Sequence, residues 1–136
     1  MTSNENVELN DGLQTAIDLY RSDQLDSAIA ATTKLGKRFP DSSKLWGYLG
    51  FLHREANDLP AAVRSFRRVV ALSPKSERAS LGLFFALWHL QKYGDALKEI
   101  GRFSLAGKPR EYISLLSGLS DPEAPARNRP LAAANR

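Results

Sequence analysis

The chain contains 136 residues, of which 43% are hydrophobic, and it carries a net charge of +4. These values are typical of one globular domain with a modest core. The absence of cysteine excludes a disulfide framework and a thiolate metal site. We expect a cytoplasmic protein without membrane contact, because no segment is apolar over the length of a membrane span and the N-terminus lacks the pattern of a secretion signal.

Positive charge is concentrated after residue 40. Residues 1–40 contain six acidic and four basic residues, so the rest of the chain carries +6. This imbalance favours acidic partners but does not by itself indicate nucleic acid. Arg64, Arg67 and Arg68 are spaced to form a basic stripe on one helix. We interpret the stripe as a solvent-exposed face, because the neighbouring aromatic Phe66 is expected in the core, so nucleic acid is not an expected partner.

The N-terminal part is predicted to form a helical hairpin after a short polar segment. Residues 1–8, MTSNENVE, are polar, and we expect them to be flexible. Helices are predicted at about Gly12–Ser22 and Ser27–Phe39. Asp23 and Asp26, between them, suit a turn and a helix N-cap.

The clearest pattern lies in residues 45–74. Trp46, Leu49 and His53 recur at the spacing of one helix face. Gly50 lies beside that face, where a side chain would block the approach of a second helix. These positions therefore predict the first helix of an interlocking pair.

The second helix of the pair is predicted from about Leu59 to Leu72. Asp58 is a good N-cap, and Pro60 falls in the first turn, where its missing N–H costs nothing. Pro74 ends the unit, because the residue before a proline avoids helical angles. The apolar stripe of this helix contains Ala62, Val63, Phe66, Val69 and Val70.

The C-terminal part predicts three more helices and a tail. The helices are expected at about Ser76–Gln91, Asp95–Ala106 and Arg110–Leu119. The last of them is apolar on one side, and we interpret it as a cap over the final apolar face. Residues 120–136 contain three prolines and no aromatic residue, a composition typical of a disordered tail.

The order of large and small residues in the central pair resembles the tetratricopeptide repeat family. Its pattern is W-x2-L-G-x2-Y, then A-x3-F, then P, with a period of 34 residues, and this chain has His where Tyr is usual. The matching residues are Trp46, Leu49, Gly50, His53, Ala62, Phe66 and Pro74. The resemblance implies an all-α right-handed superhelical solenoid of three helix-turn-helix repeats, at about 9–42, 43–76 and 77–110, with a capping helix at 110–119.

The flanking repeats depart from the pattern. Gly12 and Ser80 stand where the family has Trp, and Thr32 and Ile100 stand where it has Phe. The resemblance is therefore specific in the central repeat and weakest in the first.

By this resemblance, the first helix of each repeat lines a concave groove that binds a peptide, a helix or an extended protein segment. On the central helix the groove stripe is Gly47, Phe51 and Arg54. Aromatic residues and arginine often dominate binding energy, so the expected partner is an apolar helix or extended segment that carries some acidic residues. The predicted groove residues are Leu13, Ile17, Tyr20, Lys44, Tyr48, Phe51, Arg54, Arg78, Leu81, Phe85, Trp88 and His89.

One subclass of the family grips the C-terminal carboxylate of chaperones with lysine and asparagine side chains. By resemblance, the corresponding positions here are Leu13, Ile17, Tyr48, Arg78 and Gly82. Only the arginine among them is suited to that task. We therefore expect no such carboxylate clamp.

The sequence offers no catalytic or metal-binding motif. Neither His53 nor His89 has carboxylates at the spacing of a metal or nucleophile site, and a glycine-rich phosphate loop is absent. We expect no enzyme activity, no metal and no cofactor.

The preferred hypothesis is therefore a protein-interaction module that acts as an adaptor or in a chaperone-like role. The alternative is an immunity or inhibitor protein that neutralises a specific toxin or enzyme by direct binding. A third possibility is that the groove serves to form a homodimer.

Overall fold

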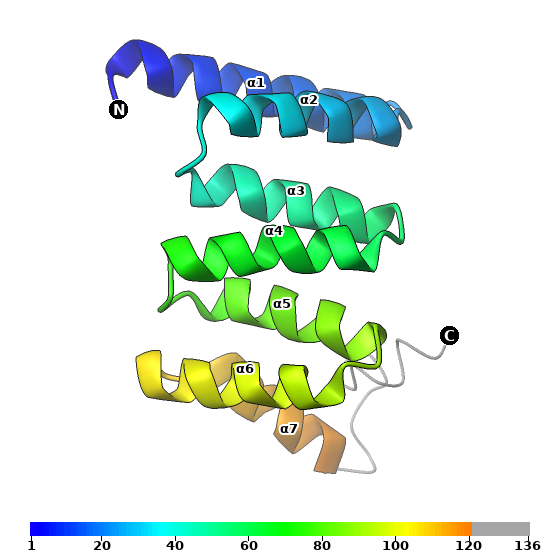
Figure 1. Ribbon diagram of the computed structural model, residues 1–136, viewed down its shortest axis with the longest axis vertical. Coiled ribbons are helices and arrows are strands. Elements are labelled where there is room, and N and C mark those ends of the chain that lie inside the picture. Colours follow the sequence, from blue (N-terminus) through cyan, green and yellow to red (C-terminus); the bar gives the residue numbers. More distant parts are fainter. Residues whose placement is uncertain (121–136) are drawn as a thin grey trace.

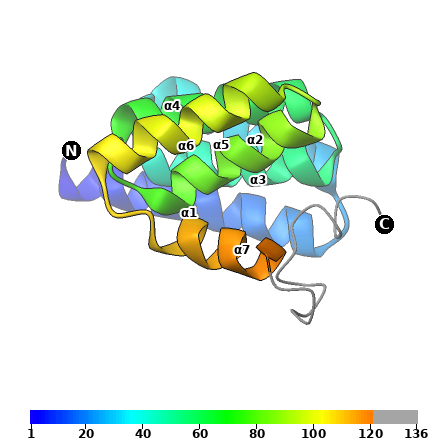
Figure 2. The ribbon, with the colours of Figure 1, turned by 90° about the horizontal axis from the view of Figure 1, so that it is seen from below.

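The computed structural model describes residues 1–120, which form seven α-helices and no strand. Six helices make three antiparallel pairs stacked one above another (Figure 1), with α1, α3 and α5 in one layer and α2, α4 and α6 in the other (Figure 2). The predicted all-α solenoid is confirmed. The predicted tail lies outside the described residues from residue 121 onward. The helices are α1 Ser3–Arg21, α2 Leu25–Arg38, α3 Ser43–Glu55, α4 Leu59–Leu72, α5 Glu77–His89, α6 Tyr93–Ala106 and α7 Arg110–Ser120.

The first helix is longer than predicted. It begins at Ser3, because the Thr2 hydroxyl accepts a hydrogen bond from the Glu5 backbone N–H (3.1 Å), while the Glu5 carboxylate accepts one from the Thr2 N–H (3.4 Å). This reciprocal capping box satisfies two N–H groups at the helix start. The predicted helix start at about Gly12 is therefore wrong, and the sequence signal for the earlier start is Thr and Glu three positions apart. That residues 1–8 are flexible stays a prediction.

The three hairpin turns have the same backbone conformation at 34-residue intervals. Asp23, Asn57 and Gln91 have φ angles of 62°, 58° and 62°, in the left-handed region that Asn and Asp tolerate better than most residues. The next residue in each turn donates a backbone hydrogen bond to the preceding helix. These bonds run from Gln24 to Leu19 (2.9 Å), from Asp58 to His53 (2.8 Å) and from Lys92 to Leu87 (2.9 Å).

Phe66 is the central core residue, and two glycines make room for it. A Cβ atom placed on Gly50 of α3 would lie 2.9 Å from the Phe66 ring, and one placed on Gly82 of α5 would lie 2.7 Å from it. Both distances are shorter than real contacts allow, so the ring of α4 fits only between two residues without side chains. Gly50 was identified from the sequence pattern, whereas Gly82 was not.

Trp46 joins the first helix pair to the second. Its indole N–H donates to the backbone oxygen of Pro40 (2.8 Å), and its ring packs against Gly36 of α2. The Arg68 guanidinium lies 4.9 Å from the centre of the Trp46 ring and donates to the same oxygen (3.0 Å). Trp46 is thus half-buried, and Arg68 supports it although the arginine lies in the exposed basic stripe.

The arginine contact recurs one period later without the tryptophan. Arg102 of α6 donates to the backbone oxygen of Pro74 (2.9 Å), 34 residues beyond the corresponding atoms of Arg68 and Pro40. Arg102 also pairs with the carboxylate of Glu99 (2.7 Å). This pairing raises the pKa of Arg102, and it holds the guanidinium in place beside the turn.

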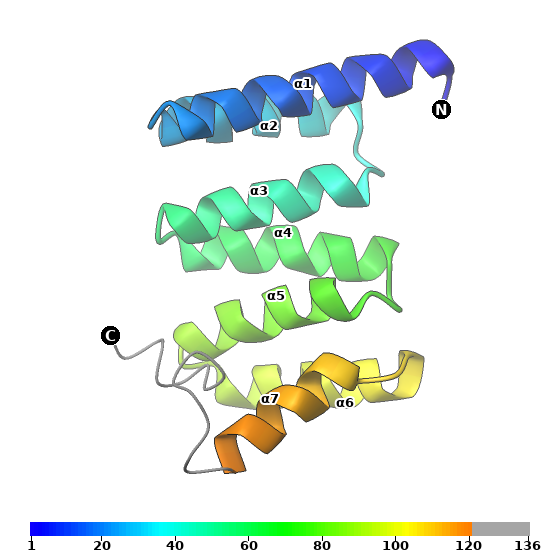
Figure 3. The ribbon, with the colours of Figure 1, turned by 180° about the vertical axis from the view of Figure 1, so that it is seen from behind.

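A polar network attaches α7 to the last pair. The Ser80 hydroxyl donates to Glu99 (2.6 Å) and lies 2.7 Å from the Tyr112 hydroxyl. The Glu77 carboxylate accepts a hydrogen bond from the Tyr112 backbone N–H (2.9 Å). Tyr112 is only 2% exposed and meets the Phe84 ring edge-on. The helix lies on the side of α1, α3 and α5 (Figure 3), and Leu115 packs beside Tyr112 in the same apolar cluster.

We predict opposite stability effects for alanine at two helical glycines. Gly101→Ala should raise the free energy of unfolding by about 1 kcal/mol, because alanine is the better helix former and its Cβ would meet nothing within 4 Å. Gly82→Ala should lower it by about 1–3 kcal/mol, because the Phe66 ring must move. Urea unfolding followed by circular dichroism measures both changes. Equal stabilisation would contradict the assigned position of Phe66.

We also predict that α7 loosens in alkali. Burial raises the pKa of Tyr112 from 10.0 to about 12. Because the folded-state pKa is the higher one, this stabilisation is complete below pH 10 and is lost as the pH approaches 12. The loss amounts to at most about 3 kcal/mol. Melting temperatures from pH 8 to 12 should fall more steeply for the wild type than for Tyr112→Phe, and parallel curves would contradict the prediction.

Candidate functional site

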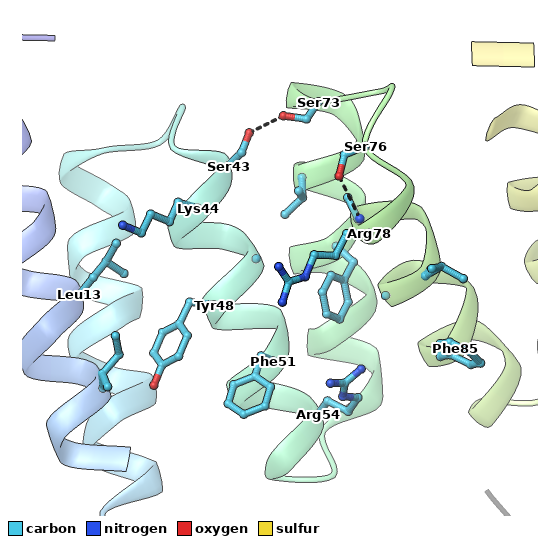
Figure 4. A pocket seen from close by; sticks show the side chains of 17 residues that line it. Leu13, Ser43, Lys44, Tyr48, Phe51, Arg54, Ser73, Ser76, Arg78 and Phe85 are labelled. Carbon is cyan, nitrogen blue, oxygen red and sulfur yellow. Dashed lines mark hydrogen bonds between the residues drawn. The ribbon is translucent and has the colours of Figure 1, made fainter. Parts of the chain in front are cut away.

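A groove of about 720 Å³ lies across α1, α3 and α5 (Figure 4). Its walls are helix faces that the 34-residue period brings into register. Nine of the twelve predicted groove residues line it, and whether they bind a partner stays a prediction. These nine are Leu13, Ile17, Lys44, Tyr48, Phe51, Arg54, Arg78, Leu81 and Phe85.

The lining residues form rows that cross the three helices. Ile17, Phe51 and Phe85 are equivalent positions of successive repeats, and they make an apolar row along the groove. A second row contains Leu13, Gly47 and Leu81, in which the glycine leaves a gap. The rows exist because equivalent side chains of stacked repeats point the same way.

Three predicted residues do not line the groove. Tyr20 meets the Phe51 ring edge-on at a centroid distance of 5.3 Å, so it supports a groove residue from outside. Trp88 packs against Phe84 (5.6 Å) and Tyr93 (4.6 Å). The ring of Tyr93 at the start of α6 gives Trp88 a partner within the last helix pair, which the sequence of α5 alone does not reveal.

His89 is the third of these residues, and it is exposed in the last turn of α5. His53 lies on α3 outside the groove lining, and burial lowers its pKa. Within residues 1–120 no cluster of three or more His, Asp or Glu side chains is placed to hold a metal ion. None of the helices there is long and apolar enough to cross a membrane.

Six residues line the groove that the sequence patterns did not predict. Phe66 and Val69 belong to α4, and they form a floor that shows between α3 and α5. The others are small residues on α3 and α5 or at the turn before α5, where a short side chain leaves the floor open. A stripe drawn on one helix cannot reveal residues that a neighbouring layer contributes. The six are Ser43, Phe66, Val69, Ser73, Ser76 and Ala79.

The charges of the groove are all positive. Lys44, Arg54 and Arg78 line it, and no acidic residue does. All three are exposed, and in the described part of the chain no carboxylate lies within ion-pairing distance of any of them. The Lys44 ammonium lies 3.5 Å from the side-chain oxygen of Asn10, and Arg54 lies 5.9 Å from the centre of the Phe51 ring. The groove therefore presents positive charge beside an apolar floor.

The positions of a carboxylate clamp all lie in this groove, namely Leu13, Ile17, Tyr48, Arg78 and Gly82. Of these side chains only that of Arg78 is charged. The absence of a carboxylate clamp stays a prediction, because only a binding measurement would test it. The other two cations of the groove occupy different positions on α3.

Tyr48 has a buried hydroxyl without a partner. Its oxygen has no hydrogen bond among the described residues, and burial raises its pKa. The ring stacks on Phe51 at a centroid distance of 5.8 Å. The ring contributes to packing, whereas burial of the hydroxyl costs desolvation free energy that no hydrogen bond offsets.

We predict that Tyr48→Phe leaves the fold intact and raises the free energy of unfolding by up to about 1 kcal/mol, because it removes an unpaired polar group. Tyr93→Phe is the matched control, since Tyr93 is 45% exposed and its hydroxyl is free to meet water. Thermal unfolding of the two variants measures the difference. A clear loss of stability in Tyr48→Phe would mean that the hydroxyl has a partner.

Comparison with known proteins identifies the fold family. A family model described as tetratricopeptide repeat matches the chain twice, at residues 13–77 and 52–111. No curated protein matches significantly. Among solved structures, a mutant of the O-GlcNAc transferase from Thermobaculum terrenum has a TM-score of 0.66 at 20% identity. The match covers 98% of this chain and 26% of the transferase chain, and it shows the fold alone.

The two family matches together extend from residue 13 to residue 111, well over half of the chain. They contain the three hairpin turns, the Phe66 core and every residue that lines the groove. The chain belongs to the tetratricopeptide repeat family.

Proposed function

We propose that the groove binds one segment of a partner protein, either a helix or an extended strand, that carries apolar and acidic side chains. The observation that supports this proposal is the combination of an apolar, aromatic floor with three exposed cations and no acid. Tetratricopeptide repeats are in general protein–protein interaction modules. The proposed role is accordingly that of a non-enzymatic adaptor or a chaperone-like protein.

The apolar and charged parts of the groove would do different work. The aromatic rings would supply affinity, because buried aromatic anchors dominate most interfaces. The exposed cations Lys44, Arg54 and Arg78 would contribute about 0.2–1 kcal/mol each, because exposed ion pairs are screened by water. Their main effects would be on the orientation of the segment and on its association rate.

The experiment begins with selection of binding peptides from a random-sequence display library on the full chain. The proposal expects selected peptides that combine aromatic or branched apolar residues with Asp or Glu. A fluorescein-labelled copy of one selected peptide then serves as the probe. Fluorescence anisotropy measures its affinity for the wild type and for the variants.

We predict that the double variant Arg54→Glu, Arg78→Glu weakens binding of that peptide by at least about tenfold, because it places two acids against the acidic peptide. The matched control is Arg64→Glu, Arg67→Glu, which makes the same change of net charge at two exposed residues of α4. The control should stay within about twofold of the wild type, because these residues lie outside the groove. Equal weakening by both pairs, or selected peptides without acids, would contradict the proposal.

A further inference from the structure

Gly47 is unlike the other glycines of the central core. A Cβ atom placed on Gly50 or Gly82 would collide with the Phe66 ring, and one on Gly36 would press against Trp46 at 3.1 Å. A Cβ atom on Gly47 would meet nothing within 4 Å. Glycine in a helix interior costs about 1 kcal/mol relative to alanine, and here no packing contact within the described chain requires it.

The space at Gly47 lies in the middle of the groove. On the neighbouring helices, Leu13 and Leu81 occupy the equivalent positions to either side. Both leucines are buried, at 4% and 8% exposure. Phe66 and Val69 also line the groove, from the layer behind. The space is therefore bounded by apolar side chains.

Charge flanks this space along α3. Lys44 lies three residues before Gly47, and Arg54 lies seven residues after it, so all three share one face of the helix. Phe51 lies between the glycine and Arg54 on the same face. An occupant of the space would thus have Lys44 on one side. On the other side it would have the ring of Phe51, with Arg54 beyond that ring (Figure 4).

We propose that the gap at Gly47 is an anchor pocket, which receives one bulky apolar side chain of the partner segment while a nearby Asp or Glu of that segment meets Lys44 or Arg78. The inference rests on the proposed function and adds the chemistry of the partner's contact residue. Anchors of this kind, seated in a pocket at the centre of an interface, carry a large share of the binding energy. The positive flanks select an acidic segment over a basic one.

The test fills the pocket from the protein side. Gly47→Leu places a side chain in the gap, and Gly101→Leu is the matched control, because its Cβ also meets nothing within 4 Å but lies on α6 outside the groove. Both variants should be at least as stable as the wild type, because leucine is a better helix former than glycine. Unfolding of Gly47→Leu alone would show that the gap is closed and would overturn the proposal.

Two probes give the readout. The first is the selected peptide, whose affinity should fall by at least about tenfold with Gly47→Leu and less with Gly47→Ala, while Gly101→Leu stays within about twofold. The second is N-acetyl-L-phenylalanine, which combines one apolar anchor with one carboxylate. In NMR titrations of the full chain it should shift the amide signals of Gly47, Phe51 and Arg78, and Gly47→Leu should remove these shifts.

The outcomes separate this inference from the proposed function. If the double variant Arg54→Glu, Arg78→Glu weakens peptide binding but Gly47→Leu does not, the anchor pocket is overturned and the proposed function stands. Binding of N-acetyl-L-phenylalanine that Gly47→Leu abolishes supports the pocket even when no peptide is selected, and it then leaves the proposed function without support. If no peptide is selected and N-acetyl-L-phenylalanine does not bind, both the anchor pocket and the proposed function are overturned.

Discussion

The ring of Phe66, held between Gly50 and Gly82, sets the distance between α3 and α5. A side chain on either glycine would push the ring away, and a smaller residue at position 66 would let the helices close over a cavity. The same ring forms part of the groove floor. The core and the candidate site therefore share Phe66, so that the width of the groove is a consequence of core packing and not of a flexible loop.

The contacts between successive helix pairs differ more from one repeat to the next than the contacts within each pair. At the first joint, Trp46 and Arg68 converge on the oxygen of Pro40. At the second, Arg102 makes the equivalent contact with Pro74. The tryptophan position there belongs to Ser80, whose hydroxyl joins the network around Tyr112. Ser80, a polar residue at the position where the family has Trp, thus contacts Tyr112 and helps to attach α7.

The sequence predicted most of this structure because helical spacing governs it. Single-helix stripes identified nine groove residues, since stacked repeats keep equivalent faces in register. The failures have physical causes. Trp88 lies on a helix with many apolar residues, and its contacts with Phe84 and with Tyr93 of the next helix place it outside the groove. The floor residues Phe66 and Val69 belong to α4, in the layer behind α3 and α5, and the stripe of a single helix does not describe them.

Contacts between helices that are neighbours in sequence favour fast folding. Each of the first six helices packs on its neighbours in sequence, and the described chain has few contacts between elements farther apart. Chains dominated by such local contacts close only short loops and fold quickly, on a scale of about microseconds to milliseconds. Opening can then begin at either end of the stack, while the central pair, clamped on both sides, persists longest. Because the groove takes residues from α1, α3 and α5, fraying of the N-terminal pair would remove one wall of the groove and leave the core around Phe66, which α3, α4 and α5 build, in place.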